Sequence, residues 1–499
     1  CPLQYLSSHS YTILINKEAD LLGQPLVEVY LNCGRNNIPL RILTVKICHM
    51  LLRVIFENFF SFKEQTEFNL FPSSRSQQLP GHIVRQDHTK VVRLSAIYGA
   101  NGAGKSNLIK AISILRDIVH DGTVEKISSS FYKIPFLLNE DTKNSPVSIA
   151  VEFYHDGVIY YYTLSFVRDS IVKEELYISR EKDDELVFSR SNEKGVQKIE
   201  FYKGYLEQNS SNAVFADALT DKILGKTDLL LSFMGEKYPE DIQAISKAYD
   251  WLFNNITIVK PNGMSGITAH QLDKNPEMLQ LLNRLLPEMN TGISKIVIRT
   301  TILQENDDTL SPSLRRRMQI AKETPGVAIP AENRFDSRVY ASVVYEHGEC
   351  LLKMMQPIHV DISGNDCQMP LESESDGTIR IIDYIPFIYS IFIEDKTYFI
   401  DEIERSVHPV MIKVIISKIS EKESCRGQLI FTTHESCLLD QKILRADEIW
   451  LTQKDSSQAT QIYPLSDFNI HKTANIEHGY LNGRYGGIPF LSNLKDLNW

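Results

Sequence analysis

The stretch Gly99-Ala-Asn-Gly-Ala-Gly-Lys-Ser106 follows an apolar run at 94–98 and precedes a run with helical spacing at 106–115. It is a complete Walker A phosphate loop. Its glycines let successive backbone N–H groups turn inward around phosphates, the Lys105 ammonium supplies a point charge, and the Ser106 hydroxyl can bind Mg²⁺. The following helix places its positive end against the anion. With a strand before the loop and a helix after it, the pattern predicts nucleoside triphosphate binding rather than a bare glycine-rich turn.

The composition is that of an ordinary globular protein. A chain of 499 residues has room for two or three domains, and 43% hydrophobic and 23% charged residues are typical values. No apolar stretch reaches the roughly 18 residues that span a bilayer, so we expect no membrane partner. Seven cysteines without CxxC pairs favour a reducing, cytoplasmic setting over a zinc site or a disulfide framework.

The net charge of −10 argues against a protein that coats nucleic acid over its whole surface. A local basic strip is still compatible with this charge, and Arg315-Arg316-Arg317 together with Lys322 is a candidate. The simpler alternative for that run is a solvated helix face.

Residues 1–49 differ from the rest of the chain. They hold three of the seven cysteines and show no sustained periodicity, whereas a strand pattern opens at Met50. We expect Met50 to be the natural start and 1–49 to be an upstream extension of uncertain status. A genuine N-terminal appendage is the alternative.

The remaining residues predict one α/β ATPase core divided by an insertion. The N-terminal lobe, 50–204, carries the phosphate loop and antiparallel strands, including a hairpin that turns at Asp156-Gly157. Residues 205–295 have apolar residues at helical spacing and predict a mainly helical insertion. The C-terminal lobe, 296–499, ends in alternating strands and amphipathic helices, which is typical of a parallel sheet.

The run 397–402, Thr-Tyr-Phe-Ile-Asp-Glu, is a buried strand that ends in two carboxylates. This is the form of a Walker B motif. Asp401 is predicted to hold Mg²⁺ opposite Ser106, and Glu402 is predicted to act as the general base for the attacking water. The alternative, a solvated acidic turn, loses weight because a Walker A motif lies upstream.

Two further elements surround this pair of motifs. His434 follows the apolar run 428–433, which predicts a histidine at the tip of the next strand, near the terminal phosphate. Ser375-Asp-Gly377 precedes a helix about 20 residues before the Walker B strand. Ser375 can cap that helix, and the helix start is then a second anion site. A simple cap is the alternative.

In this order, the four elements resemble the ABC-type ATPase head, and further motifs are similar to the SMC-related bacterial AAA/ABC ATPases. That group includes ATPase subunits of the Septu and PARIS anti-phage systems and of retron-linked defence operons, and it is related to the OLD nucleases. The motifs that carry the likeness, within 50–499, are Glu57-Asn-Phe-Phe-Ser-Phe62, Asp401-Glu-Ile-Glu-Arg-Ser-Val-His-Pro409, Leu444-Arg-Ala-Asp-Glu-Ile-Trp450 and Gly479-Tyr-Leu-Asn-Gly-Arg-Tyr-Gly-Gly-Ile-Pro489.

The resemblance implies a head dimer, or a higher homo-oligomer, in which the signature of one copy covers the ATP bound by the other. It implies a separate nuclease effector of HNH or toprim type, with DNA or a phage protein as the trigger. ATP and Mg²⁺ are the expected ligands. The expected catalytic residues are Glu402 and His434; the metal ligands are Ser106 and Asp401; the nucleotide-binding residues are Asn101, Gly102, Ala103, Gly104, Lys105, Ser106, Asn107, Ser375 and Gly377.

The sequence also departs from the ABC pattern. The signature reads Glu-Ser-Asp-Gly-Thr instead of Leu-Ser-Gly-Gly, His408 replaces the D-loop aspartate, and no glutamine is assigned to the Q-loop. The region between Lys105 and Ser375 has no sustained heptads, so long coiled-coil arms are not expected. Nor do we expect the toprim domain that OLD proteins carry after the head. Two rival functions stay open: a DNA-repair or DNA-maintenance ATPase acting on DNA ends, and an ATP-dependent scaffold with negligible turnover.

Overall fold

The computed structural model describes two compact units, 1–48 and 49–499. In the first unit it describes four strands, and in the second it describes residues 49–488 except 87–88, 194, 260–267, 333–338, 423–424 and 472–473. The strands of the first unit, β1 (Gln4–Ser8), β2 (Tyr11–Ala19), β3 (Pro25–Cys33) and β4 (Asn36–Arg41), form an antiparallel sheet in sequence order. The periodicity of 1–49 did not predict these strands.

An antiparallel sheet of seven strands opens the second unit, in the order β14-β13-β12-β11-β10-β5-β6. Its strands are β5 (Met50–Glu57), β6 (Thr66–Asn69), β10 (Val147–His155), β11 (Val158–Val167), β12 (Ser170–Ser179), β13 (Glu185–Glu193) and β14 (Val196–Phe201). The predicted hairpin is confirmed: β10 and β11 pair from Val147–Phe166 to His155–Val158 around the turn at Asp156 and Gly157.

A second sheet of six strands has the order β15-β21-β22-β9-β23-β24, and all neighbours are parallel except β24. Its strands are β9 (Leu94–Gly99), β15 (Ile256–Val259), β21 (Thr397–Ile400), β22 (Gln428–Thr432), β23 (Ile449–Lys454) and β24 (Thr460–Pro464). Parallel neighbours end at the same edge of a sheet, so the Walker A loop after β9 and the Walker B acids after β21 meet there.

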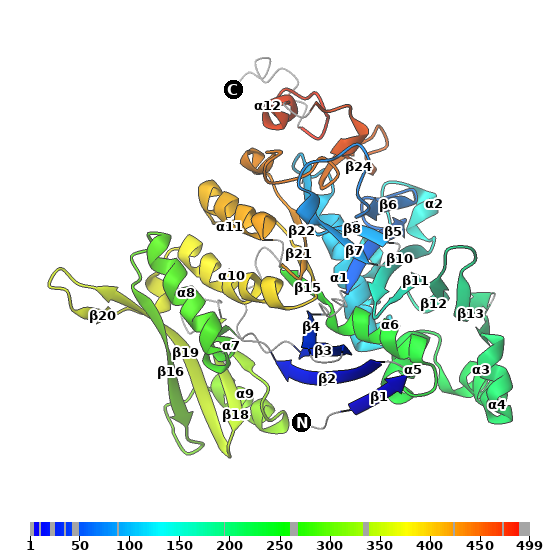
Figure 1. The fold of residues 1–499 in the computed structure, drawn as a ribbon, viewed down its shortest axis with the longest axis horizontal. Helices are drawn as coiled ribbons and strands as arrows, with labels where there is room; N and C mark the ends of the chain where they lie inside the picture. Colours follow the sequence, from blue (N-terminus) through cyan, green and yellow to red (C-terminus); the bar gives the residue numbers. More distant parts are fainter. Residues whose placement is uncertain are drawn as a thin grey trace. The chain divides into compact units, whose positions relative to one another are not determined.

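Helices cover this sheet on both faces. Figure 1 shows α10 (Asp376–Ile393) and α11 (Pro409–Glu421) on one side of β21 and β22, with α1 (Lys105–Asp121) on the other. Alternate residues of β9, Leu94, Ala96 and Tyr98, belong to the core that also contains the buried isoleucines of α10 and α11. Burial of this apolar surface against both faces makes the sheet a rigid support for the loops at its edge.

The stretch 205–295 consists mostly of helices in this structure. They are α3 (Lys203–Gln208), α4 (Ser210–Ala218), α5 (Leu230–Lys237), α6 (Gln243–Asn254), α7 (Thr268–Lys274) and α8 (Pro276–Glu288), with a π-helical turn at Leu219–Ile223. The same stretch supplies β15, the edge strand of the parallel sheet, and α6 packs on β10 through stacked rings of Trp251 and Phe153. It is therefore integrated with both sheets.

A third sheet follows, in the order β16-β19-β18-β17, with β20 paired to β19. Its strands are β16 (Lys295–Leu303), β17 (Ile329–Glu332), β18 (Val339–Glu346), β19 (Glu349–Val360) and β20 (Asp366–Gln368). Helix α9 (Pro312–Glu323) packs on it over a small core that includes Met318 and Val343. We call β16–β20 with α9 the middle lobe.

The short elements complete the second unit: α2 (Glu140–Lys143), β7 (Ile83–Gln86), β8 (Thr89–Val92), α12 (Ile476–Leu481) and 3₁₀ turns at Pro80–His82, Glu125–Ile127, Phe131–Lys133, Leu371–Ser373, Ser436–Leu438 and Leu465–Asp467. The motif residue Pro489 lies outside the described residues. In the described part of the chain, no helix is long and apolar enough to cross a membrane.

The side chain of Gln428, at the start of β22, joins the two large sheets. Its amide donates to the carbonyls of Leu51 and Val92, both at 3.1 Å. Its oxygen accepts from Leu51 N at 3.0 Å and from the Thr397 hydroxyl at 3.2 Å. All four hydrogen-bonding positions of the buried amide are thus used, as burial of a polar group requires.

Candidate nucleotide-binding site

The backbone of the phosphate loop has the conformation that its glycines permit. Gly102 and Gly104 have φ values of 78° and 109°, which residues with a side chain rarely adopt. A Cβ on Gly104 would also collide with the Thr460 hydroxyl. Within the described part of the chain, the N–H groups of Gly102 and Gly104 make no hydrogen bond. Free amides in a curled loop before a helix are the donors that bind an anion.

Side chains from distant elements hold the loop from outside. The Thr460 hydroxyl of β24 donates to the Ala103 carbonyl at 2.8 Å and lies 2.8 Å from the Ser61 hydroxyl. The Asn107 amide also donates to Ser61 Oγ, at 2.8 Å. Asn107, predicted as a nucleotide-binding residue, therefore directs its amide toward the support of the loop, while the predicted Asn101 is exposed at its tip.

Lys105 is buried beneath the loop, with 5% of its surface exposed. Its ammonium donates to the carbonyls of Gly99 at 2.9 Å and Ala100 at 3.2 Å. Burial lowers the pKa of Lys105 to about 8, against the opposing charges of Glu404, Asp401 and Glu402 in that order. The lysine is thus positively charged at pH 7 and has three carboxylates around it.

Asp401 and Ser106 meet across the edge of the sheet. The Ser106 hydroxyl donates to Asp401 Oδ1 at 2.8 Å, although the two residues are far apart in the sequence. The Thr432 hydroxyl, from the neighbouring strand β22, donates to the same oxygen at 2.7 Å. A hydroxyl and a carboxylate in contact beside a phosphate loop form a suitable pair of oxygen ligands for Mg²⁺. The residues present therefore fit the metal that the sequence predicts.

Glu402 lies at a sharp turn directly after β21. Its backbone is left-handed, with φ of 50°, a conformation that costs a non-glycine residue on the order of 1–2 kcal/mol. The turn is held by hydrogen bonds from Glu402 N to the Thr432 hydroxyl at 2.7 Å and from Arg405 N to Glu402 O at 3.0 Å. Arg405 also lies 3.4 Å from the Glu402 carboxylate. The strained turn directs the backbone away from β21 at the residue predicted to be the base.

His434 follows β22 and is positioned through its backbone. Its N–H donates to Glu404 Oε1 at 2.8 Å, while the other carboxylate oxygen of Glu404 is buried without a partner in the described residues. Partial desolvation, and next the charge of Lys105, lower the pKa of the His434 imidazole. The charge of Lys105 thus acts on the His434 imidazole.

Ser375 and Gly377 lie at the start of α10. The Ser375 hydroxyl accepts from Thr378 N at 3.1 Å, which makes Ser375 a helix cap. Gly377 approaches the segment after the Walker B acids so closely that a Cβ would lie 2.6 Å from the Ser406 carbonyl oxygen. Among the described residues, no hydrogen bond joins Ser375 to the phosphate loop of the same chain.

The structure therefore gathers Lys105, Ser106, Asp401, Glu402 and His434 at one edge of the parallel sheet, and it places Ser375 and Gly377 beside Ser406. Sequence reasoning missed four residues of this site: Ser61, Glu404, Thr432 and Thr460. Glu404 lies in the acidic run after β21, and Ser61 lies in a motif whose position relative to the loop the sequence does not show. Thr432 and Thr460 carry no signal because threonine is common in strands.

The family model described as "AAA domain, putative AbiEii toxin, Type IV TA system" matches residues 94–226 and 300–440, together more than half of the chain. The chain belongs to this family of P-loop ATPase domains. The two matched stretches contain the Walker A loop, the Walker B acids and His434. None of the curated proteins compared with the chain matches it.

Solved structures of SMC head domains align with most of the chain. The SMC head domain from Thermotoga maritima has 12% identity and a TM-score of 0.33, with 83% of this chain and 98% of that chain covered. The SMC head bound to the C-terminal winged-helix domain of ScpA has 11% identity and a TM-score of 0.38, with 83% and 97% covered. A Pyrococcus furiosus head with an extended coiled coil, bound to the C-terminal domain of ScpA, has 12% identity and a TM-score of 0.36, with 83% and 96% covered.

The predicted fold class, an α/β ATPase head with antiparallel and parallel sheets, is confirmed by the arrangement of the sheets and by the family match. The fold and the site define the protein as a P-loop ATPase domain. It is a member of the AAA family named above.

Proposed function

We propose that the protein binds and hydrolyses ATP as a regulatory subunit of a bacterial anti-phage defence system. The observation that carries the proposal is the 2.8 Å hydrogen bond between Ser106 and Asp401 beside the buried Lys105. It supports the proposal because the hydroxyl and the carboxylate that would bind the metal lie next to the cation that would bind the phosphates.

The residues of the site have distinct tasks in this reaction. The free N–H groups of the loop and the Lys105 ammonium bind the phosphates and orient them. Ser106 and Asp401 would hold Mg²⁺, which supplies positive charge to the phosphate oxygens when bound. Glu402 accepts a proton from the attacking water, and Thr432 fixes the turn on which Glu402 lies. His434 can donate or accept a hydrogen bond at the same edge through its imidazole.

We further propose that two copies close on ATP, with Ser375 of each facing the nucleotide of the other. Ser375 is exposed, and its hydroxyl lies at the positive end of an 18-residue helix. The contact of Gly377 with Ser406 connects this surface to the segment after Glu402. Through this contact, closing of the dimer at Ser375 and hydrolysis at Glu402 can influence one another within each copy.

A nuclease controlled by the head dimer is the effector that we propose. The description of the family, with a toxin of a type IV TA system, supports a role in a two-component system. The trigger that we propose for the head dimer is a phage protein or DNA. The resemblance to ATPase subunits of defence operons is the second support for this assignment.

Phosphate release by the wild-type chain and by Glu402→Gln tests the reaction. We expect the substitution to lower kcat by about 10²–10⁴-fold, the contribution of a general base, and to leave ATP affinity within about threefold. The variant should also accumulate as an ATP-dependent dimer in light scattering, whereas Lys105→Ala should stay monomeric.

Other results would contradict the proposal in different ways. Equal, near-zero rates in both chains, with intact ATP binding, would indicate a scaffold. Turnover that requires DNA ends would indicate a DNA-maintenance ATPase. No ATP binding at all would remove the basis of every function proposed here.

A further inference from the structure

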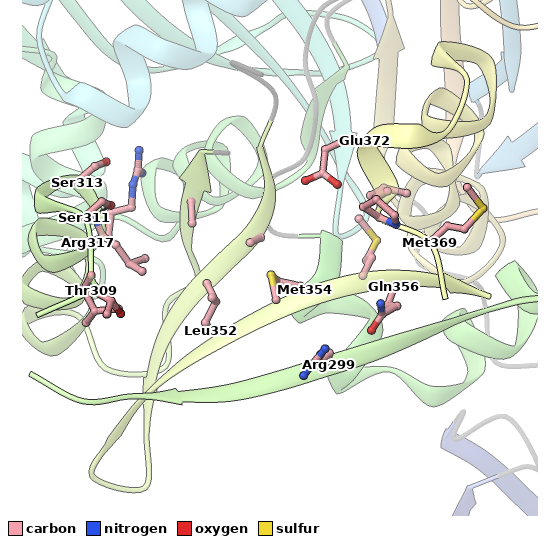
Figure 2. A pocket seen from close by; sticks show the side chains of 17 residues that line it. Arg299, Thr309, Ser311, Ser313, Arg317, Leu352, Met354, Gln356, Met369 and Glu372 are labelled. Atoms are coloured by element: carbon pink, nitrogen blue, oxygen red, sulfur yellow. Dashed lines mark hydrogen bonds between the residues drawn. The ribbon is translucent and has the colours of Figure 1, made fainter. Parts of the chain in front are cut away.

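The middle lobe contains a cavity of about 420 Å³ that none of the nucleotide-site residues lines. In Figure 2, α9 with Ser311, Ser313 and Arg317 lies on one side of it, and Met369 and Glu372 lie on the opposite side. Its volume is within the range of about 300–1,000 Å³ that small-molecule sites have. The cavity is therefore large enough for a small organic ligand.

Most of the wall is apolar and adaptable. Leu352 and Met354 come from β19, Ala341 from β18, and the buried Leu371 from the 3₁₀ turn before α10. Methionine has a flexible, polarisable side chain that fits ligands of irregular shape, and three methionines contribute to this wall. Such a surface favours a ligand with an apolar ring or chain.

Two guanidinium groups line the cavity, that of Arg317 on the side of α9 and that of Arg299 on β16 (Figure 2). The guanidinium of Arg299 of β16 makes no hydrogen bond or ion pair within the described part of the chain, and the guanidinium of Arg317 of α9 donates to the Pro330 carbonyl. Glu372 supplies one carboxylate, so the lining carries a net positive charge. The basic run on α9 is divided: Arg315 pairs with Asp308 at the surface, whereas Arg317 lines the cavity.

We propose that this cavity binds a small organic anion with an apolar body, and that its occupation shifts the start of α10. An arginine that has no acidic partner, set beside an apolar wall, is suited to a carboxylate, sulfonate or phosphate group. The regulatory half of the proposal rests on the proposed ATPase function.

Short connections link the cavity to Ser375. Met369 N donates to the Pro357 carbonyl at 3.1 Å, which attaches the far wall to β19. The turn containing Leu371 is closed by Glu374 N donating to the Leu371 carbonyl at 3.1 Å. The carboxylate of Glu374 accepts from His359 of β19 at 2.7 Å. A ligand that displaces Leu371 therefore acts on the residue directly before Ser375.

Binding of 1-anilinonaphthalene-8-sulfonate, a fluorescent organic anion, tests the site. N-phenyl-1-naphthylamine, which lacks the sulfonate, is the neutral probe for comparison. We expect Ala341→Trp, which fills the cavity, to weaken binding of the anion at least tenfold. Arg299→Glu should weaken binding of the anion tenfold and leave the affinity for the neutral probe within twofold of that of the wild type.

Matched substitutions outside the cavity are the controls. Arg316→Glu makes the same charge change on an exposed neighbour of Arg317, and Val360→Trp adds the same ring to an exposed position of β19. Both should bind the anion like the wild type. Because Arg299 is exposed, its variant should unfold at the wild-type temperature. Equal affinity of wild type, Ala341→Trp and Arg299→Glu for the anion would overturn the site.

Amide hydrogen exchange over 371–379 tests the connection without relying on turnover. We expect the anion to change exchange in this segment in the wild type and not in Arg299→Glu, and to change kcat for ATP at least twofold in the wild type alone. Binding with unchanged exchange and unchanged kcat would overturn the regulatory half. A chain that binds the anion and never hydrolyses ATP would instead contradict the proposed function and leave the cavity site standing.

Discussion

Glu404 Oε1 accepts the backbone N–H of His434 at 2.8 Å, so the segment after β21 holds the segment after β22. The second oxygen of the same carboxylate is buried without a partner in the described residues. Among the charges that act on the pKa of Lys105, Glu404 has the largest effect. Glu404 is thus a positioning residue that joins the Walker B segment, His434 and the lysine of the phosphate loop.

We expect Glu404→Ala to lower kcat for ATP about tenfold or more while KM changes by less than about threefold. A hydrogen bond to a charged group contributes about 1.5–3 kcal/mol, and about 1.4 kcal/mol corresponds to tenfold in rate. Glu404→Gln keeps an acceptor for the His434 N–H and should recover most of kcat. Steady-state kinetics measure both. An unchanged kcat in Glu404→Ala, or a loss in KM alone, would contradict this role.

Thr432 makes a sharper pair of variants possible. Its hydroxyl donates to Asp401 and accepts from Glu402 N, so Thr432→Val leaves both groups without this partner. We expect Thr432→Val to need an about tenfold higher Mg²⁺ concentration for half-maximal turnover, since loss of a group that orients a metal ligand costs about 10–100-fold in affinity. Thr432→Ser keeps the hydroxyl and should resemble the wild type. Titration of turnover with Mg²⁺ decides between them; equal curves for Val and Ser would refute the prediction.

The pKa of about 8 for Lys105 predicts how ATP affinity depends on pH. Bound phosphates favour the charged ammonium and raise its pKa, so ATP binding takes up a proton wherever the free lysine is neutral. Affinity should be level below about pH 8 and fall by up to about tenfold per pH unit above it. Calorimetry between pH 6.5 and 9.5 measures this change. In Lys105→Arg, which stays charged, affinity should be lower but flat, and a parallel fall there would exclude Lys105 as the cause.

Gly377→Ala tests the close approach of α10 to Ser406. The new Cβ would lie 2.6 Å from a backbone oxygen, so one of the two segments must move. We expect the free energy of unfolding to fall by about 1–3 kcal/mol, the usual cost of overpacking. Asp376→Ala, in the same exposed first turn, should cost at most about 1 kcal/mol. Urea denaturation of both variants provides the comparison, and equal losses would contradict a specific clash.

The strands that carry the acids and His434 could be located from the sequence. β21 and β22 lie within the runs 397–402 and 428–433 from which strands were predicted, and each strand begins at the first residue of its run. β15 was not predicted, because four apolar residues among helices do not distinguish a strand from a helix. Its place beside β21 depends on tertiary pairing that local spacing does not show.

The candidate site also has one part that could be predicted from the sequence and another that could not. The contact between Ser106 and Asp401 could be predicted because their two motifs bind the same metal ion, although they lie far apart in the chain. Ser61 and Thr460, which support the loop, act through single hydroxyls, and a single hydroxyl has no recognisable spacing. The cavity of the middle lobe depends on how α9 lies over its sheet, which side-chain volumes determine and residue patterns do not.

Gln428 has a consequence for how the protein can move. Its buried amide joins β5, β21 and Val92 through four hydrogen bonds. If one large sheet slid past the other, several buried polar groups would therefore lose their hydrogen-bond partners. We therefore expect the two sheets to travel as one rigid body during the nucleotide cycle.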